Sequence, residues 1–153
     1  MYQELRPSNG LHTLIDTFWT FSNNTSREHF DVLPDTCTDL IVDLDQNCAF
    51  FSGAMTNFQL RALAAESDLL GIRIKAEYVG ALSKIPLNET KNLRVELAEV
   101  FSVTQLDRLM RLEEAKRISD KLDFLEKWMT ALCSENHQRR DALVLAVAAY
   151  IRR

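Results

Sequence analysis

The chain has 153 residues, enough for one domain with a sizeable core. Its apolar content of 46% and charged content of 26% are ordinary for a globular protein. The longest apolar run, residues 143–151, is too short to span a bilayer, and the first residues lack the pattern of a signal peptide. Three cysteines without metal-ligand spacing indicate reduced thiols, so we expect a cytoplasmic protein with no membrane contact.

Charge is unevenly distributed along the chain. Residues 1–75 contain 5 basic and 10 acidic side chains, a net charge of −5, whereas residues 76–153 carry a net charge of +1. Phosphate groups are bound by basic surfaces. The acidic first half therefore argues against tight nucleic-acid binding by this segment itself.

The first half of the chain predicts short strands separated by turn residues. Residues 1–12 are polar and fit an arm or a short edge element. Six strands are then expected, at residues 14–21, 29–33, within 33–44, and at 48–52, 58–64 and 69–75. This pattern predicts an α+β protein with a small antiparallel β-barrel or sandwich over about residues 11–75.

The stretch from Leu33 to Leu44 organises this half. Pro34 fixes its own φ, and Asp35 is suited to accept a hydrogen bond from the backbone two residues later, which places Pro34, Asp35 and Cys37 in a structural turn. After the turn, the side chains alternate between two strand faces with a period of two, which places Leu40 on the face opposite to its sequence neighbours. The stretch therefore predicts a turn that leads into a half-buried strand.

Residues 76–153 predict a group of helices in the same single domain. One helix should end before Pro86, and residues 93–101 should form a short helix or turn. Further helices are expected around Leu106 and from a cap at Ser119 or Asp120. A last helix over 138–153 would place on one face Leu143, Ala146, Val147, Tyr150 and Ile151.

The polar residues give no pattern typical of a catalytic or metal site. The three histidines are far apart, and Cys37 has no nearby histidine, so the sequence predicts neither a metal nor a cofactor. The carboxylates Asp35, Asp39, Asp43 and Asp45 fit a solvated strand face and turn. Asp39 and Asp43 would lie about 13 Å apart along a strand, too far to share one ion.

Asp39 and Arg73 each fall on the strand face opposite their aliphatic neighbours. If their strands are close, the two side chains form a charge pair. That pair is either a purely structural ion pair, which is the commoner case, or a polar anchor for a small ligand in an apolar pocket. The side chains expected to line such a pocket, or alternatively to fill the core, are Trp19, Phe51, Met55 and Phe58.

Several segments together resemble the N-terminal sensor domain of AraC-type transcriptional regulators. They are residues 15–19, 32–41, 52–56, 69–75, 81–87 and 97–101, in this order and spacing. Two positions depart from the family pattern. Thr36 stands where the family has Gly in its Pro-Asp-Gly-Cys turn, so the turn must use φ values that a β-branched residue tolerates. Residues 76–78 replace the usual Pro-Gly-Gly.

The resemblance implies a cupin-like sensing module followed by helices, joined after residue 153 to a helix-turn-helix domain that this sequence does not contain. It implies a non-enzymatic regulatory domain that binds an unknown small-molecule effector, forms a homodimer and reaches DNA only through that further domain. The last helix, with Leu143, Val147, Tyr150 and Ile151, would make the dimer or signalling contact. Two alternatives stay open: a structural oligomerisation module without a ligand, and a small barrel enzyme.

Overall fold

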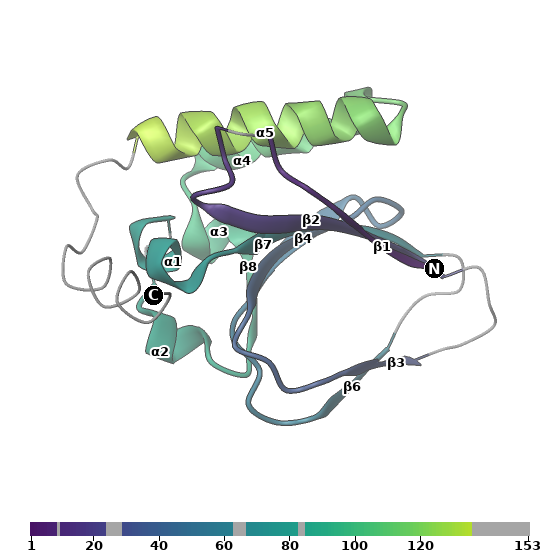
Figure 1. Ribbon diagram of the computed structural model, residues 1–153, viewed down its shortest axis with the longest axis vertical. Coiled ribbons are helices and arrows are strands. Elements are labelled where there is room, and N and C mark those ends of the chain that lie inside the picture. The colour runs from purple at the N-terminus through teal and green to yellow at the C-terminus, as the bar shows by residue number, and fades with distance from the viewer. Residues whose placement is uncertain (9, 24–28, 63–66, 83–84, 136–153) are drawn as a thin grey trace.

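The computed structural model describes residues 1–8, 10–23, 29–62, 67–82 and 85–135. It confirms the α+β class: antiparallel sheets come first and helices follow (Figure 1). The strands are β1 (Tyr2–Leu5), β2 (Ile15–Ser22), β3 (His29–Val32), β4 (Thr38–Asp43), β5 (Cys48–Ser52), β6 (Gln59–Ala62), β7 (Asp68–Ile74) and β8 (Arg94–Glu96). The helices are α1 (Ala76–Leu82), α2 (Leu87–Thr90), α3 (Leu97–Val100), α4 (Val103–Met110), the 3-10 helix η1 (Arg111–Glu114) and α5 (Ile118–Glu135).

Six strands form one antiparallel sheet in the order β1-β2-β7-β4-β5-β8, and β3 pairs with β6 in a second sheet. All six predicted strands are confirmed, and the N-terminal arm forms the edge strand β1. The expectation of a helix or turn throughout 93–101 is wrong in its first part. Residues 94–96 form β8 because they pair with the edge of β5, where Val95 lies opposite Phe51.

The large sheet has two faces of different character. Along β4, Leu40 and Val42 are buried and alternate with the less buried Asp39 and Ile41. β7 is buried from Leu69 to Ile72, and its partly exposed Arg73 lies opposite Asp39 in the strand register. One face therefore packs on helices, while the other is free to form a site.

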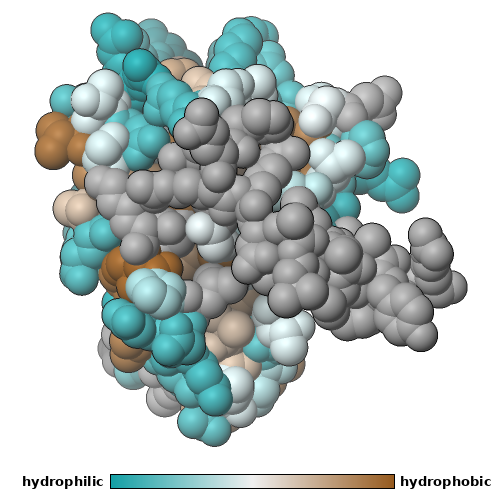
Figure 2. Space-filling model, turned by 90° about the vertical axis from the view of Figure 1, so that its left-hand side faces the viewer, coloured by the Kyte–Doolittle hydropathy of each residue, from teal (hydrophilic) through white to brown (hydrophobic). Residues whose placement is uncertain are grey.

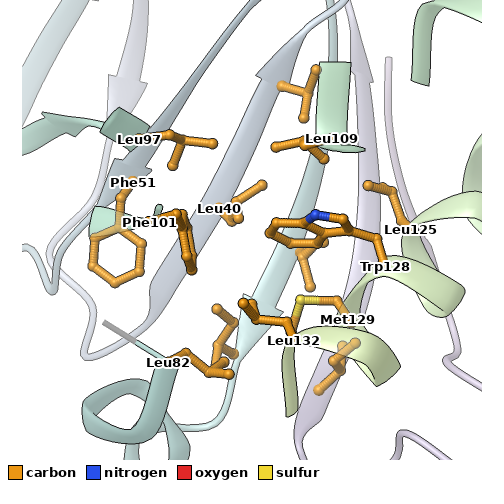
Figure 3. Close-up of a cluster of buried hydrophobic side chains, with 14 of the residues drawn as sticks. Leu40, Phe51, Leu82, Leu97, Phe101, Leu109, Leu125, Trp128, Met129 and Leu132 are labelled. Atoms are coloured by element: carbon orange, nitrogen blue, oxygen red, sulfur yellow. The ribbon is translucent and has the colours of Figure 1, made fainter. Parts of the chain in front are cut away.

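The hydrophobic core lies between this first face and α4 and α5. Figure 1 shows the two helices side by side across one side of the sheet. In Figure 3 the sheet residues Leu40 and Phe51 point toward the same cluster as Trp128 and Leu132 of α5. The Trp128 Nε1 donates a hydrogen bond of 2.9 Å to the Gln105 carbonyl oxygen, which ties α5 to α4.

Local capping sets where the helices begin. Ser102 and Gln105 form a capping box at the start of α4, in which each side chain accepts a hydrogen bond from the other residue's backbone N–H. The expected cap of α5 at Ser119 or Asp120 is wrong, because α5 already begins at Ile118. Asp120 instead lies in the first turn and accepts two hydrogen bonds of 3.0 Å from Arg117.

The predicted last helix, with Leu143, Val147, Tyr150 and Ile151, lies outside the described residues. On the face that Figure 2 shows, the described surface is largely hydrophilic, with hydrophobic residues in small separate groups. Within the described part of the chain, no helix combines the length and apolar character needed to cross a bilayer.

Candidate functional site

A cavity of about 520 Å³ lies on the free face of the large sheet, on the side away from α5. Its walls come from six strands, β1, β2, β3, β4, β5 and β7, together with Arg94 of β8 and the segments after β3 and β5. The lining residues are Tyr2, Trp19, Phe21, Asp31, Val32, Leu33, Asp35, Cys37, Asp39, Ile41, Phe50, Ser52, Gly53, Met55, Leu69, Arg73 and Arg94. This volume suits a small organic molecule.

Gly71 of β7 gives the cavity an aromatic wall. Trp19 of β2 lies opposite Gly71 in the strand register. A Cβ atom at residue 71 would lie 2.0 Å from Trp19 Cε2, so the indole occupies the space that any side chain there would need. The indole therefore lies against the strand backbone, and it is 7% exposed.

Asp39 and Arg73 form a two-point ion pair in the cavity wall. The Arg73 Nε donates to Asp39 Oδ1 at 3.1 Å, and Nη2 donates to Oδ2 at 3.2 Å. Two further carboxylates approach the same guanidinium, that of Asp35 at 3.9 Å and that of Glu4 at 4.0 Å. The predicted charge pair is thus confirmed, and Arg73 has three acidic neighbours.

Burial and the mutual interaction of Asp39 and Arg73 act in opposite directions on the pKa values of this pair. Burial raises the pKa of the Asp39 carboxyl above its usual value, although the hydrogen bonds and charge of Arg73 act in the opposite direction. Burial works against the charge of Arg73, but the hydrogen bonds and charge of Asp39 outweigh it, and the pKa of Arg73 rises. Asp39 is therefore not on a solvated strand face, as the run of aspartates suggested, since its side chain is only 14% exposed.

The indole N–H of Trp19 is a polar feature of the same wall. Its Nε1 is buried, and among the described residues no acceptor forms a hydrogen bond of good geometry with it. After burial, Arg73 and Asp35, this N–H is a smaller influence on Asp39 and lowers the pKa of the carboxyl. A buried donor without a full partner is uncommon in native proteins, and here the protein itself covers the atom, which lies against Gly71.

Two aromatic contacts complete the rim. The rings of Tyr2 and Trp19 are tilted, with centroids 5.9 Å apart, and the Tyr2 hydroxyl donates a 2.8 Å hydrogen bond to Glu4. Burial, followed by that hydrogen bond, raises the pKa of Tyr2 to about 12. The Arg94 guanidinium lies over the Phe50 ring, 3.0 Å from its centroid.

The predicted turn is confirmed and forms part of the cavity wall. The Cys37 backbone N–H donates to Asp35 Oδ1 at 3.1 Å, the expected Asx turn, and the Asp35 N–H donates to the Met55 carbonyl oxygen at 2.8 Å. Among the described non-glycine residues only Asn47 and Asn92 have positive φ, so Thr36 adopts ordinary backbone geometry. Burial raises the pKa of the Cys37 thiol, which makes it a weak nucleophile at neutral pH.

The structure brings four of the six predicted ligand-contacting residues to the cavity: Trp19, Asp39, Met55 and Arg73. Phe51 and Phe58 are not among its lining residues. Phe51 pairs with Leu40 across β4 and β5, which turns it into the helix-covered core, where it is fully buried. Phe58 lies just before β6 and is 58% exposed.

Sequence reasoning missed several lining residues. Phe21 and Ile41 follow Trp19 and Asp39 at the strand period of two, so the alternation held a signal for them. Phe50 lines the cavity in place of its neighbour Phe51, and two adjacent phenylalanines cannot be assigned to faces without the strand register. Arg94 comes from β8, which only tertiary pairing with β5 creates.

The other three aspartates of the run from Asp35 to Asp45 accept backbone hydrogen bonds at turns. Asp43 Oδ1 accepts hydrogen bonds from the backbone of Asp45 and Gln46, and Asp45 accepts one from the Asp68 N–H.

Across the described residues, no group of three His, Cys, Asp or Glu side chains is arranged to hold a metal ion.

A larger groove of about 910 Å³ lies between the loop that precedes β2, Tyr78 of α1 and one side of α5. Among its α5 residues, Asp123, Lys127 and Thr130 are exposed to solvent. This groove contains none of the predicted ligand-contacting residues. The smaller cavity, with its largely buried ion pair and aromatic wall, is therefore the candidate site.

The fold and the site define an α+β domain whose antiparallel sheet carries a ligand-sized cavity on one face and helices on the other. Residues 3–96 match the family described as a domain of unknown function, DUF6597, and because the match covers more than half of the chain, the chain belongs to this family. The matched segment ends with β8 and includes every cavity-lining residue except Tyr2. Neither a curated protein nor a solved structure matches the chain.

Proposed function

We propose that this chain is the ligand-sensing and dimerising part of an AraC-type transcriptional regulator, acts in the cytoplasm and has no enzymatic activity of its own. The observation that carries the proposal is a convergence in space. The four strand-bearing segments that resemble the AraC-type sensor domain, residues 15–19, 32–41, 52–56 and 69–75, all contribute side chains to the 520 Å³ cavity.

The chemistry of the cavity favours binding over catalysis. Its most buried charged groups form a stable pair, in which Asp39 is bound to Arg73 through two hydrogen bonds. The one thiol in its wall, Cys37, is kept protonated by burial. A ligand site with an apolar, aromatic wall and a few fixed polar groups is the usual form of a small-molecule pocket. A module that serves oligomerisation alone has no need of such a cavity.

The alternating strands give a physical route for the signal. In β4, Asp39 and Ile41 line the cavity, whereas Leu40 and Val42 pack in the helix-covered core. A ligand that shifts β4 or β7 therefore changes the packing surface of α4 and α5. For such coupling, the ligand must bind two arrangements of the helices with different affinity.

A thermal-shift screen of the purified chain against a broad set of metabolites tests the proposal. A ligand at 100 times its Kd stabilises by about 2.7 kcal/mol, which for a domain of this size raises Tm by roughly 5–10 °C. Light scattering after size exclusion, on the same sample, should give the mass of a dimer. A monomer at every concentration would contradict the dimerising role.

Two variants make the screen specific to the cavity. Ile41→Trp adds an indole to the cavity wall at the centre of β4 and should abolish the shift given by a ligand. Ile118→Trp, at an exposed position at the start of α5, is the matched control and should keep it. A screen without any stabilising compound, or a shift that survives in Ile41→Trp, would count against the sensor proposal.

A further inference from the structure

We infer that the cavity binds an organic cation, an amine or ammonium group attached to an apolar body. This inference rests on the proposed sensing function and adds the chemical class of the effector. Three carboxylates line the cavity, those of Asp31, Asp35 and Asp39, against the two guanidiniums of Arg73 and Arg94. The lining therefore carries a net negative charge when these carboxylates are ionised.

Both arginines of the lining are already engaged by the protein. Arg73 makes two hydrogen bonds to Asp39 and has the carboxylates of Asp35 and Glu4 within 4.0 Å. Arg94 lies over the ring of Phe50. An anionic ligand that approached Arg73 would meet these carboxylates, and it would gain little from a guanidinium that is already neutralised.

Carboxylate oxygens, in contrast, remain accessible to a cation. The Asp35 side chain is 43% exposed and holds only a long contact of 3.9 Å to Arg73, while its other oxygen accepts the turn hydrogen bond from Cys37. Asp31, on the opposite wall, is also exposed. An ammonium group placed near Asp35 would form a charge-assisted hydrogen bond without breaking the pair of Asp39 and Arg73.

The aromatic wall suits the same ligand. One face of the Trp19 indole lies on the backbone of Gly71, and Tyr2 is tilted against the indole at 5.9 Å. Phe21, two residues after Trp19 on β2, lines the cavity with them. Aromatic faces attract ammonium groups through the ring quadrupole, and their area also buries an apolar body. The aromatic wall and the carboxylates thus favour the same ligand, one that combines a positive charge with an apolar body.

A matched series of three probes tests the charge preference in the intact chain: 2-phenylethylamine, 2-phenylethanol and phenylacetate. They share a phenyl body and differ in the charge of the polar end. Titration by calorimetry near neutral pH should give a Kd for the amine about tenfold lower than for the alcohol, with phenylacetate the weakest. The preference should shrink as salt is added, because the carboxylates are partly exposed.

Asp35→Asn removes the accessible charge beside Arg73 but keeps the oxygen that accepts the Cys37 N–H, so the turn should survive. This variant should bind the amine about as weakly as the alcohol. Asp107→Asn, at an exposed position of α4 on the other side of the sheet, removes the same charge and should keep the full preference.

Several results would overturn the inference. They are equal or tighter binding of phenylacetate, an unchanged amine preference in Asp35→Asn, and the absence of binding by all three probes. The metabolite screen separates this failure from failure of the sensing function. A neutral or anionic compound that stabilises the chain, and loses its effect in Ile41→Trp, would leave the sensor proposal standing and remove only the choice of a cation.

Discussion

Replacing Arg73 with alanine tests whether the ion pair compensates Asp39 for its burial in the cavity wall. The variant leaves a carboxylate that is only 14% exposed without its two hydrogen bonds. Breaking a fully buried pair costs about 3–5 kcal/mol, whereas exposed pairs contribute about 0–1 kcal/mol. Because water can reach both side chains through the cavity, we expect Arg73→Ala to lower the free energy of unfolding by about 2–3 kcal/mol at neutral pH.

The loss should depend on pH in a direction that the pKa of Asp39 fixes. Burial raises this pKa in the folded chain, and removal of Arg73, which lowers it, raises it further. A folded state that binds a proton more tightly than the unfolded chain gains stability as the pH falls through that window. In measurements from about pH 8 down to about pH 5, the deficit of the variant should therefore shrink as the pH falls, because protonation of Asp39 removes its unpaired charge.

Urea unfolding followed by tryptophan fluorescence, repeated across this pH range, measures the effect. The double variant Arg73→Ala with Asp39→Asn should be more stable near pH 8 than Arg73→Ala alone, because no unpaired charge remains. Arg108→Ala is the control, since it breaks an ion pair with Glu135 in which both side chains are about half exposed, and it should cost less than about 1 kcal/mol. A loss in Arg73→Ala that matches this control, or that does not vary with pH, would refute the reasoning.

Three further predictions concern the cavity wall and the helices. Gly71→Ala places a Cβ against Trp19, so it should lower the free energy of unfolding by about 1–3 kcal/mol and change the near-ultraviolet circular dichroism spectrum. The control Gly80→Ala in α1, where a Cβ has no neighbour within 4 Å, should be neutral or stabilising. Equal effects of the two variants would contradict the packing argument. Because the pKa of Tyr2 is raised from 10.0 to about 12, the stability that this group contributes is present below pH 10 and is lost as the pH rises toward 12. Ultraviolet titration of the folded chain should show one tyrosine that ionises at higher pH than usual, and this step should be absent in Tyr2→Phe. Ser102→Ala removes the capping box of α4 and should cost about 0.5–2 kcal/mol in chemical unfolding, and an unchanged midpoint would show that the cap is dispensable.

The sequence by itself determined the local elements and the two faces of the central strands. Alternation at a period of two depends only on the backbone of a strand, so Leu40 and Asp39 were assigned to opposite faces before their strands were paired. The Asx turn at Asp35 is likewise local, because its donor and acceptor lie two residues apart. These features need no knowledge of distant neighbours.

The tertiary structure decided which strands are neighbours, and with that the site. The pairing of β4 with β7 places Asp39 opposite Arg73, and the pairing of β2 with β7 lays Trp19 on Gly71. The register of β4 and β5 sends Phe51 into the core and its neighbour Phe50 into the cavity. In each case the partners are far apart in sequence, and a shift of one residue in register would exchange the two faces, so local pattern alone cannot specify them.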